Sequence, residues 1–112
     1  MDDKFLLTLG MALRANKIAF RNEVVCDEIM MNHARIVVAA KDVYNIRAHR
    51  IYTLCQEYQT KFYQTPYTKL ELGYALGRGK TEFVSVKDKG FTKTILELAT
   101  TIGGMVINDD KI

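Results

Sequence analysis

Three short segments combine positively charged side chains with polar and aromatic ones, each just after a candidate strand and at the start of a candidate helix. They span residues 20–23, 40–43 and 65–69. The first backbone N–H groups of a helix have no intrahelical partner and attract anions, so cations beside them favour phosphate binding. Arg21, Lys41 and Lys69 are therefore the candidate phosphate contacts.

The other side chains of these segments suit recognition of a nucleic acid rather than of a small ligand. Asn22, Glu23 and Thr68 can reach base edges or the ribose 2′-hydroxyl, and Tyr67 can stack on an unpaired base. Folded or looped RNA offers all of these features together. The predicted RNA-binding residues are Arg21, Asn22, Glu23, Lys41, Tyr67, Thr68 and Lys69.

A purely structural interpretation applies to several of the same positions. Asn22, Asp42 and Thr68 are favourable N-caps, Thr68 as part of a predicted capping box with Glu71, and all three would occur at helix starts without any ligand. Other clustered cations are interpreted as solvated surface. These are Arg47, Arg50, Lys87, Lys89 and Lys93.

Nothing in the sequence has the spacing of a catalytic or metal site. His33 and His49 have neither metal-ligand spacing nor a nucleophile neighbour, so they are interpreted as surface or helix residues. Cys26 and Cys55 fall within helical apolar patterns, which predicts reduced, buried thiols. We therefore expect no enzymatic activity, no cofactor and no bound metal.

The elements that would position the three segments alternate between helices and short strands. Strands are predicted over residues 17–20, 36–40, 62–63 and 83–86. The apolar run at residues 36–40 is continuous rather than alternating, which predicts a strand covered on both faces by helices. The apolar spacing and capping residues predict helices from Phe5 to Asn16, between Asn22 and Asn32, from Asp42 to Tyr58, from Thr68 to Gly77 or Gly79, and from Asp88 to Ile102.

This alternation predicts an α/β protein, a three-layer α/β/α sandwich around a small mixed four-stranded sheet. We expect one domain over residues 1–104 and a flexible C-terminal tail over residues 105–112, because Gly103 and Gly104 follow the last helix. Ligands of open α/β sheets gather beyond the carboxyl ends of the strands. If the strands before the three segments are parallel, all three segments lie at the same end of the sheet.

Composition narrows the class of protein further. The chain has 112 residues, of which 48% are hydrophobic and 26% charged, and a net charge of +3, which indicates a globular fold rather than disorder. No apolar run approaches the roughly 20 residues that span a bilayer, and the acidic N-terminus is unlike a secretory leader. We expect a cytoplasmic monomer without membrane association.

Four blocks of this sequence, in order, resemble a known family. They are residues 13–17, 34–42, 69–77 and 88–93, within a stretch from about Phe5 to Leu98. This stretch resembles the bacterial YlxQ-type proteins, which belong to the superfamily of kink-turn-binding ribosomal proteins of the L7Ae and L30e type. The resemblance implies an α/β/α sandwich that binds RNA through the start of its second helix and the loops after its second and third strands.

The resemblance does not decide how the second helix aligns with the second helix of the kink-turn binders. Kink-turn binders begin this helix with Gly-x-Asn-Glu and have a lysine one turn later. An alignment without gaps places the glycine at Arg21 and the lysine at Asp27. A shift of one residue restores the Asn-Glu pair as Asn22 and Glu23, but it places the lysine at Cys26.

Two functions therefore fit the sequence. The first is an RNA-binding accessory protein of the ribosome or another ribonucleoprotein, with structured ribosomal or other non-coding RNA as partner and a ribosomal protein or translation factor as a further one. The second is a protein–protein adaptor on the same scaffold that has lost kink-turn recognition. The adaptor would use an apolar patch that includes Met30, Met31 and Tyr74.

Overall fold

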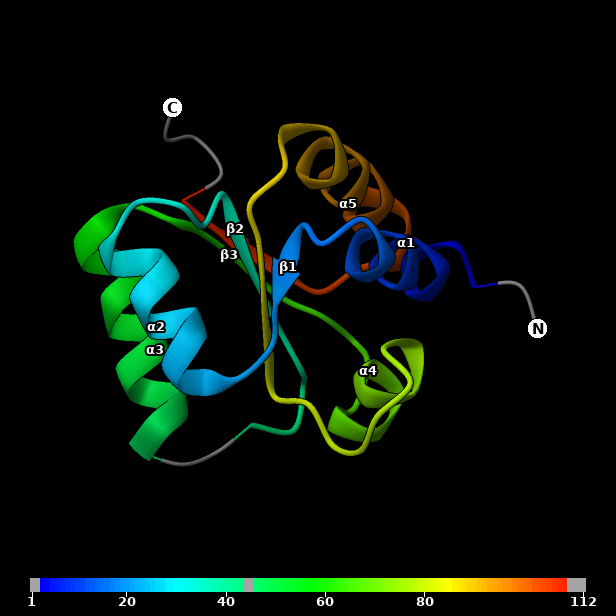
Figure 1. Ribbon diagram of the computed structural model, residues 1–112, viewed down its shortest axis with the longest axis horizontal. Coiled ribbons are helices and arrows are strands. Elements are labelled where there is room, and N and C mark those ends of the chain that lie inside the picture. Colours follow the sequence, from blue (N-terminus) through cyan, green and yellow to red (C-terminus); the bar gives the residue numbers. More distant parts are fainter. Residues whose placement is uncertain (1–2, 44–45, 109–112) are drawn as a thin grey trace.

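The chain folds into three layers, with a mixed five-stranded sheet between two layers of helices (Figure 1). The computed structural model describes residues 3–43 and 46–108, without the side chain of residue 47. Helices α2 and α3 pack together on one face of the sheet, and α1 packs with α4 and α5 on the other. The helices are α1 (Lys4–Arg14), α2 (Asn22–Met30), α3 (Ile46–Tyr58), α4 (Lys69–Ala75) and α5 (Lys89–Ile102).

The direction of the strands decides which loops meet. The strands are β1 (Ile18–Ala19), β2 (Ile36–Ala39), β3 (Lys61–Gln64), β4 (Phe83–Val86) and β5 (Met105–Ile107), in the spatial order β1-β4-β2-β3-β5. The β2 and β3 strands are parallel, and β4 is antiparallel to both β1 and β2. Strands β1, β2 and β3 therefore point the same way. We call the end of the sheet where these three strands finish its carboxyl end, and the opposite end its amino end.

The predicted sandwich is confirmed, but the strand count was wrong. Residues 105–107, expected to belong to a flexible tail, form β5, which pairs antiparallel with β3. Gly103 and Gly104 reverse the chain with φ angles of 92° and 99°, a region that disfavours other residues. A side chain at Gly104 would also collide with the carbonyl oxygen of Gln64, so the turn is packed directly onto β3. The sequence pattern of three residues was too short to predict this strand.

The helix starts agree only in part with the predicted caps. The side chain of Asp88 caps α5, and Thr68 forms a reciprocal capping box with Glu71 at the start of α4, both as predicted. The other two predictions were wrong. The N-cap of α2 is Arg21 instead of Asn22, and Asp42 accepts a hydrogen bond of 2.9 Å from the backbone N–H of Lys69 in α4.

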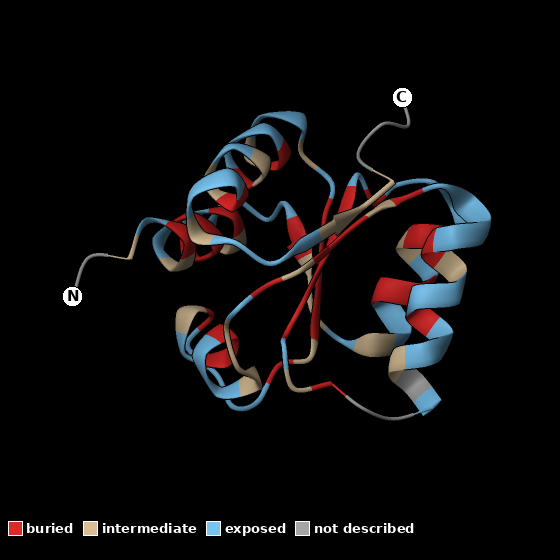
Figure 2. Ribbon diagram, turned by 180° about the vertical axis from the view of Figure 1, so that it is seen from behind, coloured by how far each residue is buried: buried red, intermediate tan, exposed pale blue. Residues whose placement is uncertain are grey.

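The core contains the apolar residues of the central strands, as the continuous run in the sequence predicted. All four residues of β2 and all four of β4 are buried, and Figure 2 shows the buried positions concentrated on the sheet and on the inner sides of the helices. Cys26 and Cys55 are free and buried, as expected. Burial raises the pKa of the Cys55 thiol to about 12, so this thiol is protonated and unreactive at neutral pH. In the part of the chain that the structure describes, every helix is too short or too polar to cross a bilayer.

One glycine fixes the loop between α4 and β4. A Cβ atom at Gly73 would lie 1.9 Å from the backbone carbonyl oxygen of Gly79, so this loop packs directly onto the α4 backbone. At Gly79 itself, a Cβ atom would meet nothing within 4 Å. The loop therefore depends on the absence of a side chain at Gly73.

The substitution Gly73→Ala should lower the free energy of unfolding by about 1–3 kcal/mol, because backbone atoms must shift to admit the methyl group. The matched control Gly79→Ala should stay within about 0.5 kcal/mol of the wild type. Urea unfolding followed by circular dichroism measures both changes. Equal stability of the two variants would contradict the packing of this loop onto α4.

Candidate nucleic-acid interface

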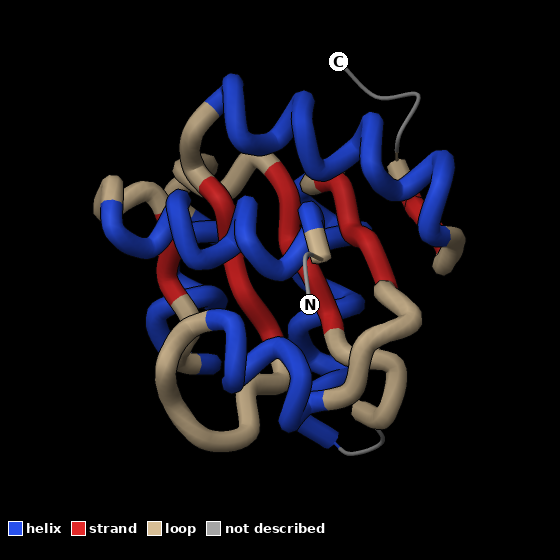
Figure 3. Tube along the Cα trace, turned by 90° about the vertical axis from the view of Figure 1, so that its right-hand side faces the viewer, coloured by secondary structure: helices blue, strands red, loops and turns tan. Residues whose placement is uncertain are grey.

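The three segments that the sequence singled out meet at the carboxyl end of the sheet, which is the lower end in Figures 1 and 3. They follow β1, β2 and β3, which point the same way. Backbone hydrogen bonds tie the loops together. The N–H of Lys41 donates to the carbonyl of Tyr67 at 2.8 Å, and the N–H of Ala40 donates to that of Glu82 at 3.0 Å. The loops thus form one surface rather than separate tips.

A hollow of about 430 Å³ opens in this surface. Four of the predicted residues line it, namely Arg21, Asn22, Glu23 and Lys69. The other three predicted residues, Lys41, Tyr67 and Thr68, belong to the adjoining loops but do not line it. The remaining lining residues are Phe20, Arg78, Lys80, Thr81 and Glu82.

Helix α2 presents an open N-terminus to this hollow. Its N-cap Arg21 has an extended backbone and makes no side-chain hydrogen bond to the first turn. The partial positive charge of the helix end and its N–H groups therefore remain available to an anion. Asn22 is oriented by Glu82, since its Nδ2 atom donates to Oε1 of Glu82 at 2.8 Å. This hydrogen bond holds the Asn22 amide beside the start of β4.

Thr68 is held by its role at the start of α4. Its hydroxyl oxygen accepts a hydrogen bond of 3.1 Å from the backbone N–H of Glu71, whose carboxylate in turn accepts one from the backbone N–H of Thr68 at 2.8 Å. The structural interpretation of Thr68 as a cap is therefore confirmed. The hydroxyl proton is still free to donate to a ligand.

Tyr67 is positioned by the interior of the protein. Its ring stacks on Phe5 with centroids 5.2 Å apart, and its hydroxyl donates to Oδ2 of Asp3 at 2.6 Å. Burial and this carboxylate raise the pKa of the Tyr67 hydroxyl far above its ordinary value, so the group remains a proton donor. One face of the ring is thus already covered, and Tyr67 joins α1 to the loop after β3.

Sequence reasoning missed two cations of the surface, Arg78 and Lys80. Both are exposed and lie in the loop before β4, which starts at the carboxyl end because it runs antiparallel to its neighbours. The guanidinium carbon of Arg78 lies 4.3 Å from the centre of the Phe20 ring, a cation–π contact that orients the side chain beside α2. If the strand at residues 83–86 had been predicted to be antiparallel, the loop before it would have been placed at the carboxyl end of the sheet with the other three segments. With these two residues, four cations face two carboxylates around the hollow.

The apolar patch considered for a protein partner does not form one surface. Met30 and Met31 lie at the end of α2, whereas Tyr74 lies on α4 on the other face of the sheet. All three side chains are exposed. Among the described residues, no group of three His, Cys, Asp or Glu side chains is arranged to hold a metal ion.

Comparisons with known proteins identify relatives over most of the chain. The profile of the ribosomal protein L7Ae/L30e/S12e/Gadd45 family matches residues 3–96. RNA-binding protein YlxQ of Bacillus subtilis (strain 168) is 30% identical over 94 residues, which cover 80% of this chain and 89% of that protein.

Two solved structures share the fold. A protein of unknown function from Bacillus halodurans C has a TM-score of 0.81 and 24% identity, over 88% of this chain and 99% of that one. The Giardia lamblia 15.5kD RNA binding protein has a TM-score of 0.72 and 14% identity, over 91% of this chain and 90% of that one.

Proposed function

The chain belongs to the ribosomal protein L7Ae/L30e/S12e/Gadd45 family, and we propose that it binds structured RNA through the carboxyl end of its sheet. The observation that carries this proposal is the convergence of the open N-terminus of α2 with the cations Arg21, Lys69 and Arg78 around one hollow. The relative named YlxQ is itself an RNA-binding protein, which supports the same chemistry. The role is binding rather than catalysis.

Each part of this surface has a task that follows from its chemistry. Arg21, Lys69, Arg78 and Lys80 would neutralise phosphates, because their charged side chains line the hollow beside the helix start, and Lys41 would do so from the adjoining loop. Asn22 and Glu23 offer an amide and a carboxylate, which can read base edges or a ribose 2′-hydroxyl. Thr68 would donate its hydroxyl proton. The partner we propose is a ribosomal or other non-coding RNA, bound as an accessory component of a ribonucleoprotein.

Helix α2 supports a weak rather than a strong preference for kink-turns. Cys26 is only 7% exposed, so a side chain at this position faces the core and does not reach a ligand. Asp27, the alternative position for the lysine of kink-turn binders, is exposed and negatively charged. Under either alignment no cation extends from the helix one turn after its start. A carboxylate there would repel a phosphate.

The adaptor hypothesis has less support, because its expected patch is divided between the two faces of the sheet. It predicts a protein complex that survives nuclease treatment. Recovery of such a complex together with no measurable affinity for RNA would replace the proposal made here.

The double substitution of Arg21→Gln and Lys69→Gln should weaken binding to structured RNA. Each lost phosphate contact should reduce the slope of log affinity against log salt by about 0.7–0.9, so two contacts reduce it by about 1.5. Fluorescence anisotropy with a labelled hairpin that contains an internal loop measures this slope between about 50 and 300 mM salt. The control is Lys4→Gln with Arg50→Gln, two exposed cations that do not line the hollow. Equal slopes for the two double variants, or wild-type affinity independent of salt, would contradict the proposal.

The substitution Asp27→Lys should raise the affinity for a kink-turn hairpin by roughly tenfold, since an exposed carboxylate is exchanged for a phosphate-contacting cation. Affinity for a fully paired hairpin of the same length should rise much less. The two affinities are measured by the same anisotropy assay. An equal gain on both RNAs would mean that Asp27 does not face the kink-turn site.

A further inference from the structure

The amino end of the sheet carries a second basic surface, larger than the first. A groove of about 1330 Å³ runs between α5 and the loops that precede β2 and β3. We call it the amino-end groove, and six cations line it: Lys17, Arg35, Lys61, Lys87, Lys89 and Lys93. The only carboxylate among its described lining residues is Glu97. The groove thus gathers more positive charge than the net charge of +3 on the whole chain.

The sheet itself places three of these cations in a row. The antiparallel register pairs Ile18 and Ile36 with Val86 from either side. Lys17 therefore lies directly across from Lys87 in the next pair outward, while Arg35 lies on the other side of β4, next to the Ile36–Val86 pair. Backbone hydrogen bonds hold these positions. The N–H of Lys87 donates to the carbonyl of Lys17 at 3.0 Å, and the N–H of Arg35 donates to the carbonyl of Val86, the residue before Lys87, at 2.8 Å. Neighbouring strands are about 4.8 Å apart, which sets the spacing of the row.

This arrangement is electrostatically unfavourable for the protein alone. Like charges directly opposite one another on neighbouring strands are destabilising. Lys89 adds to the repulsion, since it is the first residue of α5, where the helix dipole disfavours cations and the capping carboxylate of Asp88 offsets only part of this effect. Lys17, Arg35, Lys89 and Lys93 make no ion pair with a carboxylate in the described part of the chain. A bound polyanion would relieve both sources of repulsion.

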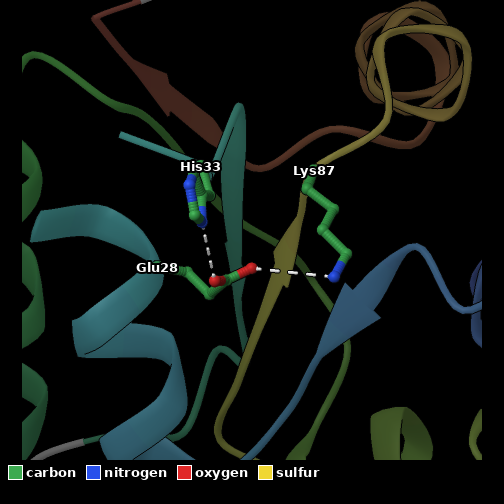
Figure 4. Close-up of polar contacts among 3 residues, drawn as sticks. All are labelled: Glu28, His33 and Lys87. Carbon is green, nitrogen blue, oxygen red and sulfur yellow. Dashed lines mark hydrogen bonds and ion pairs between the residues drawn. The ribbon is translucent and has the colours of Figure 1, made fainter. Parts of the chain in front are cut away.

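Glu28 lies beside the groove without lining it and compensates part of the charge of one groove cation, Lys87 (Figure 4). Its Oε1 atom lies 4.0 Å from Nζ of Lys87, and its Oε2 atom lies 3.3 Å from Nδ1 of His33. The carboxylate of Glu28 in α2 is thus shared between two partners. One is His33, in the loop after α2, and the other is Lys87, directly after β4. This contact positions Lys87 in the row without neutralising the remaining cations.

We propose that the amino-end groove is a second RNA-binding surface, which holds the phosphate backbone of an RNA segment other than the one at the carboxyl end. The row of cations and the lysines of α5 suit a chain of phosphates, and the half-exposed ring of Tyr58 in the groove wall offers a face to a base. The two surfaces lie at opposite ends of the same strands, so one RNA helix end does not cover both. The protein would hold two segments of a folded RNA at a fixed separation.

The test uses the full chain and a fluorescein-labelled oligouridylate of about 20 nucleotides, which lacks the structure proposed for the carboxyl end. The variant Arg35→Gln with Lys93→Gln should bind it roughly tenfold more weakly near 100 mM salt, with a salt slope lower by about 1.4. The control variant Lys4→Gln with Arg50→Gln should bind like the wild type. The charge-conserving pair Arg35→Lys with Lys93→Arg should retain binding, which separates a loss of charge from a loss of fold.

Comparison with Arg21→Gln and Lys69→Gln on the same probe separates this inference from the proposed function. Weakening by the Arg35 and Lys93 variant, whatever the carboxyl-end variant does, supports the second surface. Affinity and salt slope equal to those of the control variant would overturn it, even if the carboxyl-end variant loses binding to the structured hairpin.

Discussion

The parallel pairing of β2 with β3 is the constraint on which both proposed surfaces depend. Residue by residue, it matches Ile36 to Ala39 with Lys61 to Gln64, so the loops after these two strands leave the sheet at the same end. The antiparallel β4, inserted between β1 and β2, brings its preceding loop to that end as well. Reversing either strand would send Lys41 or Lys69 to the opposite end. The position of the cations is therefore a property of the sheet and not of any single loop.

The two ends of the sheet differ in chemistry, and this difference suggests different tasks. The carboxyl end mixes cations with an amide, a hydroxyl and two carboxylates, which is a combination able to discriminate among RNA structures. The amino end has six cations and a single lining carboxylate among the described residues. Such a surface adds affinity for phosphates without reading sequence. Specific recognition at one end and backbone contact at the other would together orient the protein on a folded RNA.

Local sequence patterns predicted the features that depend on neighbouring residues. The apolar run at residues 36–40 indicated a buried strand, and Thr68 with Glu71 predicted a capping box, because each feature is made within a few positions of the chain. The sequence also predicted that Arg21 and Lys69 lie at the same end of the sheet, on the assumption that the strands before them are parallel. Four of the seven predicted site residues line the hollow for this reason.

Contacts between distant residues could not be predicted in the same way. Asp42 accepts a hydrogen bond from the first residue of a helix that starts 27 positions later, and Tyr67 stacks on Phe5, so neither role is visible in the local pattern. Arg78 and Lys80 join the surface only because β4 is antiparallel, and β5 forms only because Gly104 can pack on Gln64. In each case the local sequence allowed several structures, and contacts with distant parts of the chain determined which one formed.

The central claim is that RNA contacts the carboxyl end of the sheet, and chemical-shift mapping tests it most directly. The nitrogen-15-labelled protein is titrated with an unlabelled RNA hairpin that contains an internal loop, and its amide resonances are followed by NMR. The account predicts that the largest shifts fall on residues 21–24, 40–42, 67–69 and 78–82. Shifts that leave all four of these segments unchanged while the RNA is bound would contradict it.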